Sequence, residues 1–139
     1  MGCMTKVLKM RSKYHSRKIT RDGITFDSMK EYRRYCDLKL LERAGKIQDL
    51  KRQVEFELLP AQFEDIPTGE IYRQGERKGQ PKYKRVCVEK SVKYVADFTY
   101  HSADTGKMVV EDTKGFKTKD YILKRKMMLY FHGIKIKEV

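Results

Sequence analysis

The sequence has few cysteines and histidines, which stabilise many small domains through disulfides or a bound metal, and it has no long apolar run. Its three cysteines, Cys3, Cys36 and Cys87, are an odd, widely spaced set without a Cys-x-x-Cys pair, so we expect reduced thiols in a cytoplasm. The three histidines are scattered and form no zinc-binding spacing. No apolar run approaches the roughly 20 residues that cross a bilayer, and no secretory signal is visible. These absences predict a cytoplasmic domain with no membrane partner.

Negative charge is also scarce. Lys and Arg number 32 and Asp and Glu 19, which gives a formal net charge of +13 for 139 residues. Such an excess favours a polyanion such as nucleic acid over the alternative that the charge serves solubility alone. Residues 1–21 carry seven basic and no acidic residues. We interpret them as a basic arm that grips phosphates, with Lys13, Arg17 and Lys18 among its contacts, and residues 22–139 as one domain.

Helical and strand-like patterns alternate along that domain. Apolar spacing predicts a helix from Ser28 to Ala44 and another over 118–131, which Gly133 ends. Alternation predicts strands over 53–59, within 86–100, over 108–113 and over 134–137, whereas residues 61–81 indicate a long loop or mobile hairpin tip. The order indicates an α/β fold with a central mixed sheet flanked by two helices. The active site is expected at one edge of that sheet.

The predicted hairpin between residues 92 and 113 brings acidic residues together. A turn near Asp104 places Asp97 opposite Asp112, and a register error of one residue would place it opposite Glu111. Because strand side chains alternate, Asp112 and Lys114 share one face while Glu111 projects from the other. Two carboxylates and a lysine therefore converge.

Converging carboxylates repel one another unless a cation compensates. Oxygen ligands of this kind suit Mg²⁺, and Mn²⁺ as a substitute. A hard cation can polarise a phosphate and activate water, and a nearby lysine can stabilise the charge that develops in the transition state. Asp97 and Asp112 with Lys114 are thus suited to phosphodiester hydrolysis.

The same residues carry a resemblance to a known family. Asp97 followed by Asp112-Thr113-Lys114 resembles the PD-(D/E)XK nuclease motif, with Ala96 where the name has proline. The runs Gly23 to Glu31, Tyr94 to Phe98 and Val110 to Thr118 are similar to small tailed-phage proteins classed as predicted endonucleases. The resemblance implies a restriction-endonuclease-like core and a metal-dependent endonuclease that leaves a 5′-phosphate and a 3′-hydroxyl.

Phage Holliday-junction resolvases of this fold share the order of helix glutamate, strand aspartate and acid-x-lysine. The resemblance implies that Glu31 is a further metal ligand or water holder. Ser28-Met29-Lys30-Glu31 is also a capping box, so Glu31 has a structural alternative, and both roles can coexist. Gln53 is a weak candidate that either reaches the site or pairs at a strand end. Glu111 is expected as a surface or supporting carboxylate.

The basic residues after Lys114 are the expected DNA contacts, in preference to an ordinary solvated helix face. They are Lys117, Lys119, Lys124, Arg125 and Lys126. Tyr32, Tyr35 and Tyr130 are expected in the core.

The resemblance favours branched DNA as substrate, in phage recombination or packaging inside the host bacterial cytoplasm, and a homodimer that cuts two strands symmetrically. The alternatives are a catalytically inactive DNA-binding accessory protein with the same fold and a basic structural phage protein.

Overall fold

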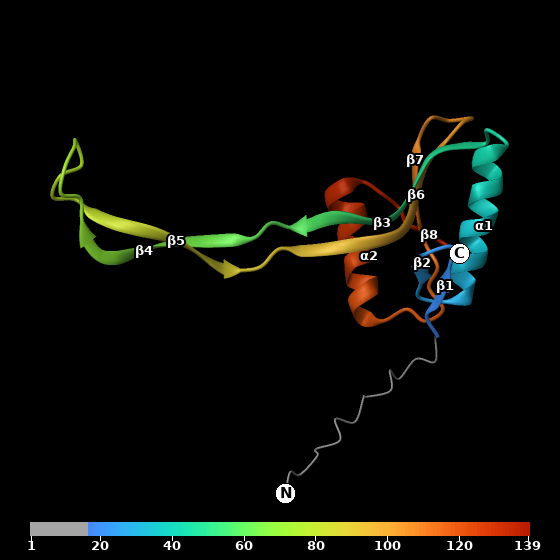
Figure 1. Ribbon diagram of the computed structural model, residues 1–139, viewed down its shortest axis with the longest axis horizontal. Coiled ribbons are helices and arrows are strands. Elements are labelled where there is room, and N and C mark those ends of the chain that lie inside the picture. The colour runs from blue at the N-terminus through green and yellow to red at the C-terminus, as the bar shows by residue number, and fades with distance from the viewer. Residues whose placement is uncertain (1–16) are drawn as a thin grey trace, which may run out of the picture.

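A computed structural model describes residues 17–139 (Figure 1). The chain order is β1 (Ile19–Arg21), β2 (Ile24–Phe26), α1 (Met29–Arg43), β3 (Ile47–Leu59), β4 (Gln62–Ile71), β5 (Pro81–Glu89), β6 (Val92–Ser102), β7 (Met108–Asp112), α2 (Lys119–His132) and β8 (Lys137–Glu138). A four-stranded mixed sheet lies between the two helices, as Figure 1 shows. The expected α/β architecture is confirmed.

The first helix is defined by its ends. Ser28 is the N-cap, and its side chain accepts a hydrogen bond from the Glu31 amide. Gly45 follows the last turn with φ +71°, a conformation that glycine adopts without steric cost. Before the helix, β1 and β2 form a tight hairpin whose turn residues, Asp22 and Gly23, both have positive φ. This hairpin brings Phe26 under α1, where it is buried.

The central sheet has the order β3-β6-β7-β8. Its first two pairings are antiparallel, and β8 joins β7 in parallel. The strands that carry Asp97 and Asp112 are therefore the two inner strands. The candidate residues lie where β7 ends beside β6.

Strand β6 changes layers at Asp97. Tyr94 and Ala96 pack in the cluster that contains Met128 of α2, whereas Phe98 and Tyr100 pack with Leu38 of α1. In a regular strand all four would share one face, because they are an even number of residues apart. The change of face means that Asp97 lies at the junction between the two halves of the core.

The prediction for residues 61–81 was partly right, because residues 72–80 are the tip of a hairpin but residues 62–71 form strand β4. These residues belong to a two-stranded arm, β4 paired with β5, that projects away from the sheet in Figure 1. Every residue of β4 is exposed, so neither face needs apolar residues and the alternating pattern that reveals a strand is missing. Pro67 is tolerated because a two-stranded ribbon has only edge strands.

Smaller predictions also need correction. Tyr130 is 83% exposed and is no core residue. The last strand begins at Lys137 and not at residue 134, and β3 begins at Ile47, six residues before the predicted strand. Ile19–Arg21 form a strand, and residues 1–16 of the predicted basic arm lie outside the described residues. No helix within residues 17–139 is long and apolar enough to cross a membrane.

The arm should be dispensable for folding, because β4 and β5 pack chiefly on each other. Leu59 and Val92 are register partners at its base, so an Asn-Gly turn can replace residues 60–91 and close a two-residue hairpin. We expect cooperative thermal unfolding with a midpoint within a few degrees of the full chain, measured by circular dichroism. A molten or insoluble product would show that the arm stabilises the core.

Candidate active site

The register of the β6–β7 hairpin brings the two predicted aspartates level. The last printed pair is Phe98 with Glu111, and one further step along each strand places Asp97 opposite Asp112. Asp97 lies close enough to raise the pKa of Asp112 through its negative charge and a side-chain contact. The convergence expected from the sequence is confirmed.

Asp112 is a fully buried carboxylate with an incomplete set of partners. Its Oδ2 accepts a hydrogen bond of 2.6 Å from the Tyr94 hydroxyl, whereas Oδ1 is buried without a hydrogen-bond partner. Burial raises the pKa of Asp112 to about 6, the Tyr94 hydrogen bond opposes this, and the charge of Asp97 adds to it. An unpaired oxygen in this position costs free energy and is available to a cation.

Lys114 lies on the same side as Asp112, as strand alternation predicts. Its Nζ is 3.6 Å from the unpaired Oδ1 of Asp112 and 5.2 Å from the centroid of the Tyr121 ring. The ammonium group is half-buried and does not complete the hydrogen bonding of that oxygen. It is therefore placed beside the two carboxylates with donors left for another ligand.

Thr113 fixes the orientation of Asp97. The Thr113 amide and hydroxyl both donate to Asp97 Oδ2 at 2.8 Å. One carboxylate oxygen of Asp97 is thus held by the residue between Asp112 and Lys114, which links the middle of the acid-x-lysine triplet to the other acid. The sequence assigned no role to Thr113, although its place in the triplet marks it.

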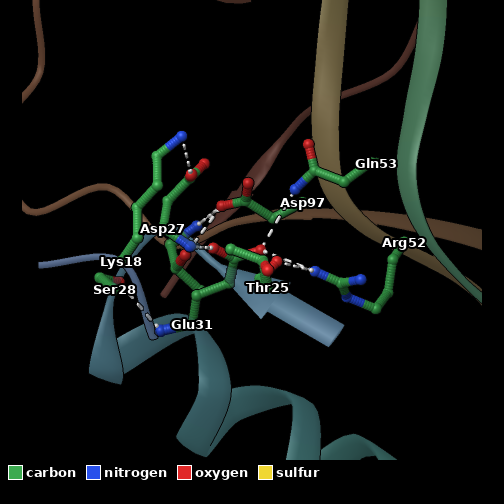
Figure 2. A network of polar contacts seen from close by, with 9 residues as sticks. Lys18, Thr25, Asp27, Ser28, Glu31, Arg52, Gln53 and Asp97 are labelled. Carbon is green, nitrogen blue, oxygen red and sulfur yellow. Dashed lines mark hydrogen bonds and ion pairs between the residues drawn. The ribbon is translucent and has the colours of Figure 1, made fainter. Parts of the chain in front are cut away.

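Glu31 lies next to Asp97 and also ties down the start of α1 (Figure 2). Its Oε2 accepts from the Asp27 amide at 2.9 Å, and its Oε1 accepts from Gln53 Nε2 at 3.1 Å. Burial raises the pKa of Glu31, the Asp27 hydrogen bond lowers it, and the charge of Asp97 raises it further. The Ser28 side chain accepts from the Glu31 amide, as the capping box predicts, but the Glu31 carboxylate accepts from the Asp27 amide and not from the expected Ser28 amide.

Gln53 lies inside β3, beside the candidate site, and not at a strand end. It lies between the pairs Arg52–Phe98 and Val54–Ala96 of the β3–β6 ladder, level with Asp97. Its φ of +51° is a left-handed conformation that costs a non-glycine residue of order 1 kcal/mol. The side chain of the same residue donates to Glu31, as Figure 2 shows.

Arg52 completes this side of the network. Its guanidinium lies over the Phe26 ring at 4.3 Å, donates to the Thr25 carbonyl at 3.2 Å and approaches Glu31 Oε1 at 3.6 Å. Arg52 thereby balances part of the negative charge of Glu31. Sequence reasoning missed it, because its partners come from a distant hairpin and helix.

Glu111 is buried on the opposite face, so of the two expected roles, a surface or a supporting carboxylate, the first is wrong and the second agrees with its burial. Arg34 Nε and Nη2 donate to its two oxygens at 2.8 and 2.6 Å, and the Tyr100 hydroxyl donates at 2.5 Å. Burial alone would raise the pKa of Glu111, but these hydrogen bonds outweigh it and the pKa is lowered. Glu111 thus anchors α1 to β7 and is turned away from Asp97.

The acidic residues fit a hard divalent cation in chemistry, although residues 17–139 hold no ready-made cluster of three His, Cys, Asp or Glu ligands. The unpaired Oδ1 of Asp112 and the remaining oxygen of Asp97 are the available carboxylate oxygens. Both oxygens of Glu31 already accept hydrogen bonds. A two-aspartate site completed by water or phosphate oxygens suits Mg²⁺, which usually keeps several waters.

The predicted basic contacts do not form one cluster. Lys117 and Arg125 both pair with Glu138, and these hydrogen bonds lower the pKa of Glu138 to about 2. On α2, Lys119 and Lys126 are exposed and Lys124 is half-buried. Near the N-terminus, Arg17 is exposed, Lys18 is 3.8 Å from Asp27, and Lys13 lies outside the described residues.

A basic pocket beside the site was not foreseen. It has a volume of about 300 Å³ and is lined by Lys30, Arg33, Arg34, Asp37, Thr113 and Val139. Lys30, Arg33 and Arg34 come from one face of α1, where the spacing of three and four residues was the available signal. Since Thr113 also holds Asp97, this pocket is suited to a phosphate next to the acids.

A family model described as "Protein of unknown function (DUF1064)" covers residues 11–138. The chain belongs to this family. No curated protein and no solved structure matches it. The DUF1064 match includes Glu31, Asp97, Asp112 and Lys114, so the whole candidate site lies within the family's domain.

Removal of the charge of Asp112 should stabilise this DUF1064 domain. Its pKa is about 6 when folded and 3.8 ordinarily, so folding becomes less favourable as pH rises from 4 to 6, and the cost is complete above 6. Asp112→Asn should raise the free energy of unfolding at pH 8 by about 1 to 3 kcal/mol and have less effect at pH 4.

Glu111→Gln is the matched control in the neighbouring position. It removes the charged partner of Arg34 and should lower the free energy of unfolding by roughly 2 to 4 kcal/mol. Urea denaturation of both variants at pH 4 and pH 8 measures the difference. A destabilised Asp112→Asn protein at pH 8 would contradict the conclusion that the buried, ionised Asp112 carboxylate lowers the free energy of unfolding.

Proposed function

We propose that the protein is a Mg²⁺-dependent DNA endonuclease that hydrolyses phosphodiester bonds. The observation that carries the proposal is the pairing of Asp97 with Asp112, whose buried Oδ1 lacks a hydrogen bond and lies 3.6 Å from the Lys114 ammonium. A structural role does not account for that unpaired oxygen, since burial of an unpaired carboxylate oxygen destabilises the fold.

Each residue of the site would have a separate role in hydrolysis. Asp97 and Asp112 would hold the cation, which when bound supplies Lewis acidity and a water of lowered pKa. Thr113 would keep Asp97 in its orientation, and Tyr94 would do the same for Asp112. Lys114 would donate to a non-bridging phosphate oxygen, where negative charge develops.

Glu31 and Gln53 have a positioning role in this proposal. Their hydrogen bond fixes the start of α1 against β3 at the level of Asp97. The rigid placement of the helix also keeps the basic pocket of Lys30 and Arg33 beside Thr113. A phosphate held there would be aligned with the carboxylates, and alignment of reactants is a large part of catalysis.

Branched DNA is the substrate that we favour, through the resemblance to Holliday-junction resolvases. Symmetric cutting of a junction requires two active sites, so the proposal includes a homodimer. The positive net charge of +13 supports a nucleic acid partner without specifying its form.

A cleavage assay on a labelled four-way junction, a linear duplex and a single strand tests the proposal. With Mg²⁺ or Mn²⁺ we expect cutting of the junction, and a loss of at least about a hundredfold in rate for Asp97→Asn, Asp112→Asn and Lys114→Ala, with DNA binding retained. Lys107→Ala, at the far end of the hairpin, is the control and should cut normally. Tight binding without cutting under any metal would favour the inactive accessory protein.

The cutting rate should depend on pH through Asp112. Its carboxyl must be ionised to hold a cation, and its pKa is about 6, so the rate should increase from pH 5 to pH 7. Protons and cation compete for the same oxygens, so a higher Mg²⁺ concentration should move the midpoint to lower pH. A rate that falls over this range in a protein shown to be folded at pH 5 would contradict the assignment.

A further inference from the structure

The β4–β5 arm carries a charge pattern that the site does not use. Its distal part, residues 72–85, has six Lys or Arg residues and one glutamate. Arg73, Arg77 and Lys78 are exposed at the tip, and Lys84 and Arg85 are exposed on β5. Lys84 and Arg85 lie on the antiparallel ribbon, whereas the three tip residues lie in the connection between β4 and β5. Backbone hydrogen bonds from the Tyr72 amide to the Gln80 carbonyl and from the Gly79 amide to the Tyr72 carbonyl close that connection.

Aromatic side chains lie among these charges. Arg77 and Lys82 lie over the Tyr72 ring at 5.9 and 5.5 Å, and Arg85 lies over Phe63 at 4.1 Å. The tip also has an open pocket of about 380 Å³ lined by Asp65, Tyr72, Arg77, Gln80, Pro81 and Tyr83. Basic groups interleaved with aromatic rings and an amide suit phosphates and base edges.

The length of the arm determines how far from the acidic residues it can contact DNA. From Gln53 at the site to the end of β4 at Ile71, the chain advances about 3.3 Å per residue, so the tip lies up to roughly 60 Å from the acids, or about 15 to 18 base pairs of duplex. A two-stranded ribbon also fits the width of the major groove. The arm continues the β3–β6 ladder outward from the site, as Figure 1 shows.

We propose that the β4–β5 arm is a DNA-binding ribbon that grips duplex about 15 to 18 base pairs from the cut, through Arg73, Arg77 and Lys78. This inference rests on the proposed function and adds a second contact to it. A second protein copy is a poorer occupant for this surface, because the chain is strongly basic and a positive tip would be repelled by its partner. Duplex DNA offers the complementary charge.

The test measures the affinity for four-way junctions with arms of about 8 or about 25 base pairs, in Ca²⁺, by fluorescence anisotropy over a range of salt. The wild type should bind the long-armed junction roughly 10- to 100-fold more tightly. R73A/R77A/K78A should lose that preference, bind short arms normally, and show a salt slope on long arms that is smaller by about 2 to 3.

The control variant R43A/K46A/K107A also removes three exposed positive charges, at the end of the core far from the arm. It should keep the preference for long arms. The inference is overturned if the wild type binds both junctions equally, if the tip variant keeps the preference, or if the tip variant turns a dimer into a monomer in sedimentation.

A separate readout distinguishes this inference from the endonuclease proposal. If the wild type prefers long arms but cuts no junction in Mg²⁺ or Mn²⁺, the endonuclease proposal fails and the arm remains a DNA-binding element. If it cuts short-armed junctions at the same rate with and without the tip charges and shows no length preference, the arm inference fails and the endonuclease remains.

Discussion

The structure depends on two carboxylates that lie opposite one another on the two inner strands of the sheet. Asp97 and Asp112 repel one another, and Asp112 is buried with one oxygen lacking a hydrogen bond. The surrounding contacts hold both side chains despite that cost: Thr113 binds Asp97 twice and Tyr94 binds Asp112. Such an arrangement stores unfavourable free energy that a cation would release.

The rest of the core can be understood as support for this pair. Strand β6 changes layers at Asp97, so the residues before it pack against α2 and those after it pack against α1. The Arg34–Glu111 ion pair ties α1 to β7 on one face, and the Glu31–Gln53 hydrogen bond ties α1 to β3 on the other side of Asp97. Both helices are therefore fixed relative to the carboxylates, which is the requirement for a preorganised site.

Local sequence patterns were sufficient to predict much of the fold and of the candidate site. Sequence spacing predicted α1 and its Ser28 cap, the pairing of Asp97 with Asp112 across a short turn, and the shared face of Asp112 and Lys114. Each of these depends on residues close in the chain, where the periods of helix and strand and the geometry of a hairpin decide the outcome.

Contacts between distant segments could not be predicted in this way. Glu111 meets Arg34 across 77 residues and Gln53 meets Glu31 across 22, and no local period encodes either pairing. Strand β4 of the arm was missed because exposed strands show no alternation and the prolines and glycines of this stretch resemble a loop, so only the hairpin tip was offered as an alternative. Tyr130 was placed in the core by its helical spacing, yet the sheet covers a different face of α2.

The most direct measurement of the central claim is the binding of Mn²⁺, observed by electron paramagnetic resonance, to the wild type, Asp97→Asn, Asp112→Asn and Lys114→Ala at pH 7.5. The account predicts that the wild type and Lys114→Ala bind the ion and that both aspartate variants lose it while remaining folded. Mn²⁺ binding that is equal in all four proteins, or undetectable in the wild type with DNA present, would contradict the assignment of Asp97 and Asp112 as a cation site.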